Sequence, residues 1–245
     1  MVSKNQIKTI TGLKQKKHRK QHKMFFAEGI KVVQELLNSN LQLHHLYTTD
    51  TVFNTVDKDK ATIISEAELK KISALATPQA CLALFYIPDE KPLPDNGLIL
   101  ALDDVRDPGN LGTIIRLCDW FGIEHLVCSE ACVDAFNPKV VQATMGSLSR
   151  VNVVYTELEA YLQKSGLPVY GTFMDGSNVY TENLPENGIV VLGNEANGIS
   201  ADVEALCSHR IAIPRFGNMQ QTESLNVATA GAIILSEFRR NFSGT

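Results

Sequence analysis

Three segments of this 245-residue chain share one pattern, in which an apolar run ends at a loop carrying Gly or Pro beside polar side chains. The first runs from Leu102 to Arg116, the second from Val190 to Ile199, and the third from Ile211 to Asn226. Apolar runs of this kind are typical of buried strands. Strand ends that deliver polar loops to one edge of an α/β sheet commonly form a ligand site. The sequence therefore predicts an α/β fold with one site at a sheet edge.

Strand and helix patterns alternate along residues 98–245. Helices are expected at 111–121, 138–149, 157–164, 200–206 and 224–242, and strands at 98–102, 125–128, 151–155, 169–173, 189–192 and 210–213. Several of these strands are apolar throughout, which is typical of a parallel sheet covered by helices on both faces.

A smaller alternating α/β unit is expected in residues 1–90. It contains a short basic helix within 7–17, a helix from 30 and another at 66–75, and strands at 24–29, 43–47, 61–64 and 80–87. The segment from Pro88 to Gly97 holds three prolines with charged residues and is typical of a stiff connector. We expect an N-terminal domain at 1–90, a linker at 91–97 and a C-terminal domain at 98–245.

The charge of the chain is distributed unevenly. Residues 1–31 carry nine basic side chains and one acidic, a net +8, whereas the remaining residues carry 14 basic and 26 acidic, a net −12. A basic block on an otherwise acidic protein favours a polyanion such as RNA at this end, although a solvated helix face or a terminal tail has the same composition. The candidate RNA-binding residues are Lys14, Lys16, Lys17, Arg19 and Lys20.

Several classes of protein are disfavoured by composition. No apolar run approaches the roughly 20 residues needed to span a bilayer, and the N-terminus lacks an apolar signal core, so a cytoplasmic protein without membrane partners is expected. Five cysteines, most of them inside apolar runs, favour reduced buried thiols. Cys128 and Cys132 lack a second pair at zinc-ligand spacing, so no metal is expected.

The first polar loop contains two candidate site residues. Asn110 is suited to cap the helix that follows Pro108 and Gly109. Arg116 projects opposite the apolar stripe of that helix, where it could bind a phosphate or form a surface ion pair with Asp119.

The second and third loops add a carboxylate, a hydroxyl and an amide. Gly193 and Gly198 bracket Glu195 in a tight turn that matches neither a Walker loop nor a dinucleotide fingerprint. Ser224 and Asn226 are expected to open the last helix, where each could serve a ligand or simply cap the helix.

The three motifs together resemble those of the SpoU (TrmH-like) RNA ribose 2′-O-methyltransferases. The matching residues are Asn110-x-Gly-x-x-x-Arg116, Leu192-Gly-Asn-Glu-Ala-Asn-Gly-Ile199, and Ile213-Pro followed by Glu-Ser-Leu-Asn-Val227, in the order of the family. The N-terminal half, with Leu13-Lys-Gln-Lys-Lys and Phe25-Phe-Ala-Glu-Gly, is similar to an RNA-binding domain of the ribosomal protein L30e type. The resemblance covers nearly the whole chain.

This resemblance implies a C-terminal parallel-sheet domain with a deep trefoil knot that binds S-adenosylmethionine, and a homodimer that completes the site. By motif position, Gly193, Ile213 and Leu225 would line the cofactor site. The catalytic and RNA-facing set would be Asn110, Arg116, Glu195, Ser224 and Asn226. The expected substrate is ribosomal RNA, with transfer RNA as the alternative. A non-catalytic RNA-binding protein that keeps the fold and a nucleotide-binding α/β enzyme of another class are the competing hypotheses.

The expected chemistry fits these residue types. The ribose hydroxyl must attack the methyl group and lose its proton, yet the three motifs contain no histidine or lysine as an ordinary base. Because arginine stays protonated, Arg116 suits a clamp on the phosphate of the target nucleotide, orienting the hydroxyl and passing its proton to that phosphate. The span 215–223 is longer than in many family members, and Arg215 and Phe216 could add RNA contacts or be merely structural.

Overall fold

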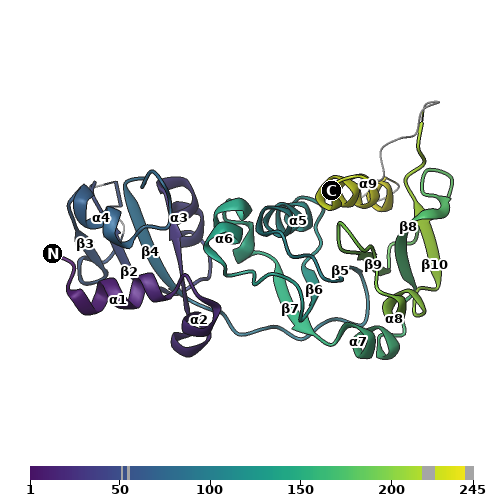
Figure 1. The fold of residues 1–245 in the computed structure, drawn as a ribbon, viewed down its shortest axis with the longest axis horizontal. Helices are drawn as coiled ribbons and strands as arrows, with labels where there is room; N and C mark the ends of the chain where they lie inside the picture. The colour runs from purple at the N-terminus through teal and green to yellow at the C-terminus, as the bar shows by residue number, and fades with distance from the viewer. Residues whose placement is uncertain (51, 54–55, 217–223, 241–245) are drawn as a thin grey trace. The chain divides into compact units, whose positions relative to one another are not determined.

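The computed structural model describes residues 1–50, 52–53, 56–216 and 224–240, and the chain divides into two compact units (Figure 1). The first unit comprises Met1–Asp89 and Asp134–Arg150, and the second comprises Glu90–Val133 and Val151–Thr245. The segment 134–150, which the sequence division placed with the C-terminal domain, thus groups with the first unit. Within the described ranges, no helix has both the length and the apolar character needed to cross a membrane.

The first unit is built on a four-stranded sheet in the order β1-β4-β2-β3. Strand β4 pairs antiparallel with both neighbours, and β2 pairs parallel with β3. The elements of this unit are α1 (Lys4–Gly12), α2 (Lys16–His22), β1 (Met24–Glu28), α3 (Ile30–Leu37), β2 (Leu43–Thr48), η1 (Lys58–Lys60), β3 (Ala61–Ile63), α4 (Glu66–Ile72), β4 (Cys81–Tyr86), α6 (Pro138–Thr144) and η2 (Ser147–Ser149).

The basic helix expected within 7–17 forms two helices instead of one. Ser3 and Gln6 make a capping box that starts α1 early, at Lys4. Helix α1 ends at Gly12, and α2 then begins at Lys16. Ile10 and Leu13 are buried in a core shared with α4 and with strands β1, β2 and β4, so the end of the first helix is anchored by apolar packing.

The second unit is built on a six-stranded, wholly parallel sheet in the order β10-β8-β9-β5-β6-β7. Its elements are β5 (Leu98–Leu102), α5 (Pro108–Trp120), β6 (His125–Ser129), β7 (Asn152–Thr156), α7 (Leu158–Lys164), β8 (Val169–Asn178), β9 (Gly188–Leu192), α8 (Ala201–Glu204), β10 (His209–Ala212) and α9 (Val227–Arg239). The predicted α/β class, with a parallel sheet and a small N-terminal α/β unit, is confirmed.

Helices cover both faces of the parallel sheet, with α5 and α9 on one side and α7 and α8 on the other (Figure 1). Ile99, Ala101 and Val191 belong to the core cluster that includes α7 and α8. Because side chains alternate along a strand, the even-numbered neighbours face the other helix pair. There Gly231 of α9 lies so close to Leu192 that an added Cβ would be 3.0 Å from its Cδ1.

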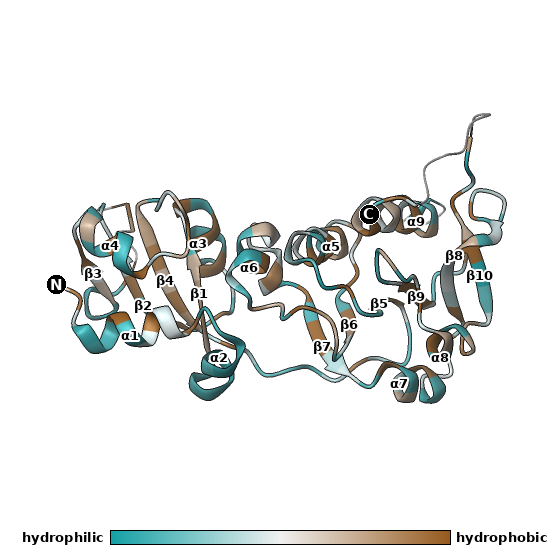
Figure 2. Ribbon diagram, in the orientation of Figure 1, coloured by the Kyte–Doolittle hydropathy of each residue, from teal (hydrophilic) through white to brown (hydrophobic). Residues whose placement is uncertain are grey.

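The hydropathy of the elements follows this layering. Figure 2 shows hydrophobic residues along strands such as β4 and β9 and hydrophilic residues along α2. All five residues of β5 and all five of β9 are buried, as the unbroken apolar runs predicted.

Two of the larger differences from the expected element boundaries have distinct causes, one in the local backbone and one in the pairing of strands. The helix expected at 138–149 ends at Thr144, since Met145 and Gly146 take positive φ values of 51° and 99°. The strand expected at 169–173 extends to Asn178, because its far half pairs with β10 after a register shift at Arg210/Ile211. Pairing across the sheet carries no signal in the local sequence of β8.

Candidate active site

The first loop of the site follows β5 and is joined to the end of β9. The backbone N–H of Asp103 donates to the carbonyl of Leu192 at 2.9 Å. The Asp103 carboxylate is buried and accepts the backbone N–H of Ser200 at 2.7 Å. Two of the three predicted strand ends therefore meet at one edge of the sheet, as expected for parallel neighbours.

The second loop closes on itself after β9. The backbone groups of Asn194 and Gly198 exchange two hydrogen bonds of 2.9 Å. A Cβ at Gly193 would lie 2.3 Å from the carbonyl carbon of Gly198 and 2.4 Å from the nitrogen of Ile199, so only glycine fits there. The Asn194 side chain donates to the carbonyl of Asp104 at 2.7 Å and thereby ties the second loop to the first. Glu195 sits in this closed turn.

Asn110 does not have the capping role that the sequence predicted for it. The N-cap of α5 is Asp107, whose carboxylate accepts the backbone N–H of Asn110 at 2.8 Å, and Pro108 occupies the first helical turn. The prediction that Asn110 caps this helix is wrong, because an Asp followed by Pro is the stronger start signal. Asn110 instead uses its side chain across the loops: Nδ2 donates to Oε1 of Glu195 at 2.5 Å.

The third segment reaches the same cluster through Asn226. This residue caps α9, its Oδ1 accepting the backbone N–H groups of Ala228 and Thr229, and its Nδ2 donates to Oδ1 of Asn110 at 2.9 Å. The expectation that Ser224 begins the last helix is wrong, since α9 starts at Val227 after the Asn226 cap. Ser224 is an exposed residue before the helix.

Asn226, Asn110 and Glu195 consequently form one hydrogen-bonded chain, which we call the three-loop cluster. Asn110 lies in the first turn of α5, Asn226 is the N-cap of α9 and Glu195 lies in the turn after β9, and the hydrogen-bonded pairs are separated by 116 and 85 residues in sequence. The carboxylate of Glu195 orients the amide of Asn110, and the amide of Asn110 in turn orients that of Asn226. Hydrogen bonds to an ionised acceptor are shorter and stronger than those between neutral groups.

Arg116 lies outside the three-loop cluster. It is six residues after Asn110 on α5, about 9 Å further along the helix axis. Its side chain is exposed, and Trp120, one turn later, is 85 % exposed. The Arg116 guanidinium therefore faces solvent on α5, the helix that also carries Asn110. This position is suited to binding the phosphate of an external nucleotide.

Two of the predicted cofactor residues directly follow strands, and the third lies just before a helix. Gly193 follows β9 directly, half-buried Ile213 follows β10, and Leu225, which is 47 % exposed, precedes the Asn226 cap. Strands β9 and β10 flank β8 in the sheet. The region 217–223, which contains most of the long loop between Arg215 and Ser224, lies outside the described residues. Arg215 and Phe216 themselves are exposed.

Sequence reasoning missed three residues that hold the first loop in place. Asp103 and Asn194 make the loop-to-loop hydrogen bonds described above, and Cys132 accepts the backbone N–H of Val105 at 3.3 Å and donates to the carbonyl of Leu102 at 3.4 Å. A hydrogen bond with Cys128 lowers the pKa of the Cys132 thiol to about 7. The available signal was the position of Asp103 immediately after an all-apolar strand.

The candidate RNA-binding residues of the first unit divide into two groups. Lys14, Lys16, Lys17 and Lys20 are exposed. Arg19 is buried: its Nε and Nη2 donate to Asp134 at 2.9 and 2.5 Å, and its Nη1 donates to the carbonyl of Leu13 at 2.7 Å. The expectation of an RNA-facing Arg19 is therefore corrected, because its side chain is 3 % exposed and its guanidinium donates to Asp134 and Leu13 inside the unit.

Across the part of the chain that the structure describes, no group of three or more His, Cys, Asp or Glu side chains is arranged to hold a metal ion.

Comparison with known proteins identifies a family for each of two segments of the chain. Residues 97–236 match the model of the SpoU rRNA methylase family, and residues 4–83 match that of an MRM3-like substrate-binding domain. The chain is 33 % identical to a Bacillus subtilis protein named 23S rRNA (guanosine(2553)-2′-O)-methyltransferase, over 97 % of each chain. A solved structure from Porphyromonas gingivalis, assigned to the TrmH family, aligns with a TM-score of 0.89 at 41 % identity, covering 98 % of this chain and 99 % of that one. An AdoMet-bound rRNA methyltransferase from Sinorhizobium meliloti aligns with a TM-score of 0.87 at 28 % identity, covering 100 % and 98 %.

Proposed function

Since the chain belongs to the SpoU rRNA methylase family, we propose that it transfers a methyl group from S-adenosylmethionine to a ribose 2′-hydroxyl of ribosomal RNA. The observation that carries this proposal is the three-loop cluster, in which the three motif segments meet through Asn226, Asn110 and Glu195. The 2′-O-methyltransferase relative and the AdoMet-bound neighbour support the reaction and the cofactor.

The residues present fit such a cofactor. Gly193 leaves the backbone of the second loop without a side chain, and Ile213 and Leu225 offer apolar carbon beside backbone polar groups. We infer that these three residues hold S-adenosylmethionine, which when bound supplies an electrophilic methyl group on a sulfonium. Glu195 adds a carboxylate, a group suited to face a positive charge.

Both polar atoms of the Asn226 amide have partners within the protein. Its oxygen caps α9 and its nitrogen donates to Asn110, so we assign Asn226 and Asn110 to positioning rather than to substrate contact. The exposed Ser224 hydroxyl is then the group of this segment that remains to bind the ribose. Arg116 would hold the phosphate of the target nucleotide and orient its 2′-hydroxyl, and most of the acceleration would come from positioning.

Three further features of the family belong to this proposal. A homodimer is supported by Trp120, since a tryptophan 85 % exposed on α5 is suited to burial against a second copy, and sedimentation measures the assembled mass. A deep trefoil knot in the C-terminal domain is implied by family membership. A cytoplasmic location, expected from the sequence, also belongs to this proposal.

The test is transfer of labelled methyl from S-adenosylmethionine to unmodified ribosomal RNA, with unmodified transfer RNA in parallel. Arg116→Ala should lower methylation by about 100- to 1,000-fold, the cost typical of one lost donor to a reacting group, while RNA binding is retained. Arg150→Ala, an exposed arginine paired with exposed Glu35, is the matched control and should leave the rate unchanged. Methylation of transfer RNA alone would favour the second substrate, and RNA binding without any transfer would favour a non-catalytic binder.

A further inference from the structure

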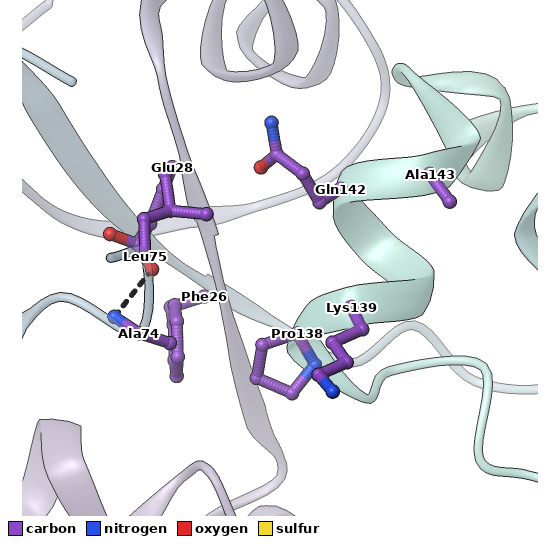
Figure 3. A pocket seen from close by; sticks show the side chains of 8 residues that line it. All are labelled: Phe26, Glu28, Ala74, Leu75, Pro138, Lys139, Gln142 and Ala143. Carbon is purple, nitrogen blue, oxygen red and sulfur yellow. Dashed lines mark hydrogen bonds between the residues drawn. The ribbon is translucent and has the colours of Figure 1, made fainter. Parts of the chain in front are cut away.

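The first unit contains a cavity of about 280 Å³ that the methyl-transfer site does not use. Strand β1, the segment after α4 and helix α6 line it, and all of these belong to the first unit (Figure 3). Drug-sized ligands occupy pockets of about 300–1,000 Å³. A cavity slightly below this range suits one small planar group rather than a whole nucleotide.

The walls of the cavity are mainly apolar. Phe26 and Leu75 lie on the strand side and Pro138 on the helix side, and Gln142 extends from α6 toward the strand side (Figure 3). An apolar slot with a single amide suits a flat group with apolar faces and a hydrogen-bonding edge. An unstacked nucleobase has this chemistry.

Glu28 also borders the cavity, but its carboxylate serves the protein. It accepts the hydroxyl of Ser73 and the backbone N–H of Ala74, the second at 2.8 Å. Burial raises the pKa of this carboxyl, and the hydrogen bonds from Ser73 and Ala74, followed by the charge of Lys14, partly offset the effect. Glu28 therefore holds the wall formed by Ser73 and Ala74 in place and leaves contact with a ligand's edge to Gln142.

The basic segment begins at the rim of the cavity. The Nζ of Lys14 donates to the carbonyl of Ser73 at 2.8 Å, next to the lining residue Ala74. From Lys14 to Lys23 the chain has six lysines and arginines and no acidic residue. Lys139 adds an exposed ammonium group from the opposite wall. Positive charge on both sides of an apolar slot complements a base flanked by phosphates.

We propose that this cavity binds one unstacked base of the RNA substrate, with Gln142 bonding the edge of the base and Lys14 and Lys139 facing the neighbouring phosphates. The inference rests on the proposed function, since it requires that the chain binds RNA. It adds a base-binding site in the first unit, separate from the nucleotide that is methylated.

The test fills the cavity with Ala143→Leu and measures methylation kinetics on protein-free, unmodified ribosomal RNA. Stacking of one base is worth about 1–3 kcal/mol, so KM for RNA should rise by roughly 5- to 150-fold, while kcat and the affinity for S-adenosylmethionine stay unchanged. Ala76→Leu is the matched control, since Ala76 is exposed and lies in the same unit outside the lining, and its KM should not change.

Gln142→Ala keeps the test valid if the filled variant does not fold. It removes the edge contact without adding volume, and it should raise KM for RNA in the same direction. The inference is overturned if both variants keep the wild-type KM for RNA. It is also overturned if they impair methylation only of protein-bound ribosomal particles, which would assign the cavity to a protein partner. A wild-type protein that methylates no RNA would instead remove the proposed function, so the two failures are distinct.

Discussion

The polar side chains at the sheet edge of the second unit bind one another, whereas the lysines of the first unit's basic segment mostly face solvent. Asn226, Asn110 and Glu195 are joined in a chain across three loops. Lys16, Lys17 and Lys20 are exposed on one short helix. The first arrangement restricts geometry, and the second concentrates charge.

This difference indicates how each surface should respond to mutation. Groups that must be held in a reactive geometry depend on their neighbours, so changes there should be large and non-additive. Attraction of a polyanion sums over many charges, so changes there should be small per residue and additive. Arg19 belongs to neither surface, since its guanidinium is buried against Asp134.

The largest effect is expected at Gly193. In Gly193→Ala the new Cβ would meet the backbone of Gly198 and Ile199 at 2.3–2.5 Å, so the second loop must move. A displacement of about 1 Å at a reacting geometry can cost roughly 100-fold, and we expect at least that loss in kcat/KM for methylation. Labelled methyl transfer to unmodified ribosomal RNA measures it.

Gly198→Ala in the same loop is the matched control. Gly198 has a positive φ of 70° and no atom within 4 Å of an added Cβ, so this variant meets backbone strain of about 1–2 kcal/mol without a clash. Its methylation rate should fall much less than that of Gly193→Ala. Equal losses would show that loop conformation, rather than close backbone approach, is what Gly193 provides.

A smaller effect is expected from coupling within the three-loop cluster. Asn110→Ala and Glu195→Ala each break the 2.5 Å hydrogen bond between these side chains, so the double variant should lose less than the sum of the two. We expect a coupling of about 0.5–3 kcal/mol in the activation free energy, measured as kcat/KM in a double-mutant cycle. Asn110→Ala combined with Lys164→Ala, a change at an exposed residue, should be additive within about 0.5 kcal/mol. An additive first cycle would mean that the cluster does not act as a unit.

The sequence predicted the sheet and its site because both have local signals. The buried strands β5 and β9 are unbroken apolar runs, and each ends at a loop rich in Gly, Pro, Asn or Asp. The ordered motifs then indicated which loops meet. Neither signal specifies side-chain partners, which depend on the closure of the fold.

The errors have the same origin. Arg19 looks like its lysine neighbours in sequence, and only the fold brings Asp134, 115 residues away, into contact with it. The side-chain partner of Asn110 was likewise missed, since Glu195 is 85 residues away and gives no local signal. The cavity of the first unit is likewise lined by both β1 and α6, two elements that are more than 100 residues apart in sequence.

The smallest effect per residue is expected from the exposed lysines. Replacing Lys16, Lys17 and Lys20 by Gln should lower RNA affinity and reduce the slope of log K against log salt by about 0.7–0.9 for each lysine that contacts a phosphate. The same three-charge change at Lys58, Lys60 and Lys70, which are exposed in the same unit, is the matched control. Titrations between 50 and 200 mM salt, the range in which counterion release is measured, distinguish the two sets. If both triple variants flatten the slope equally, RNA responds to the overall charge of the unit; a flatter slope in the first set alone places the phosphate contacts on α2.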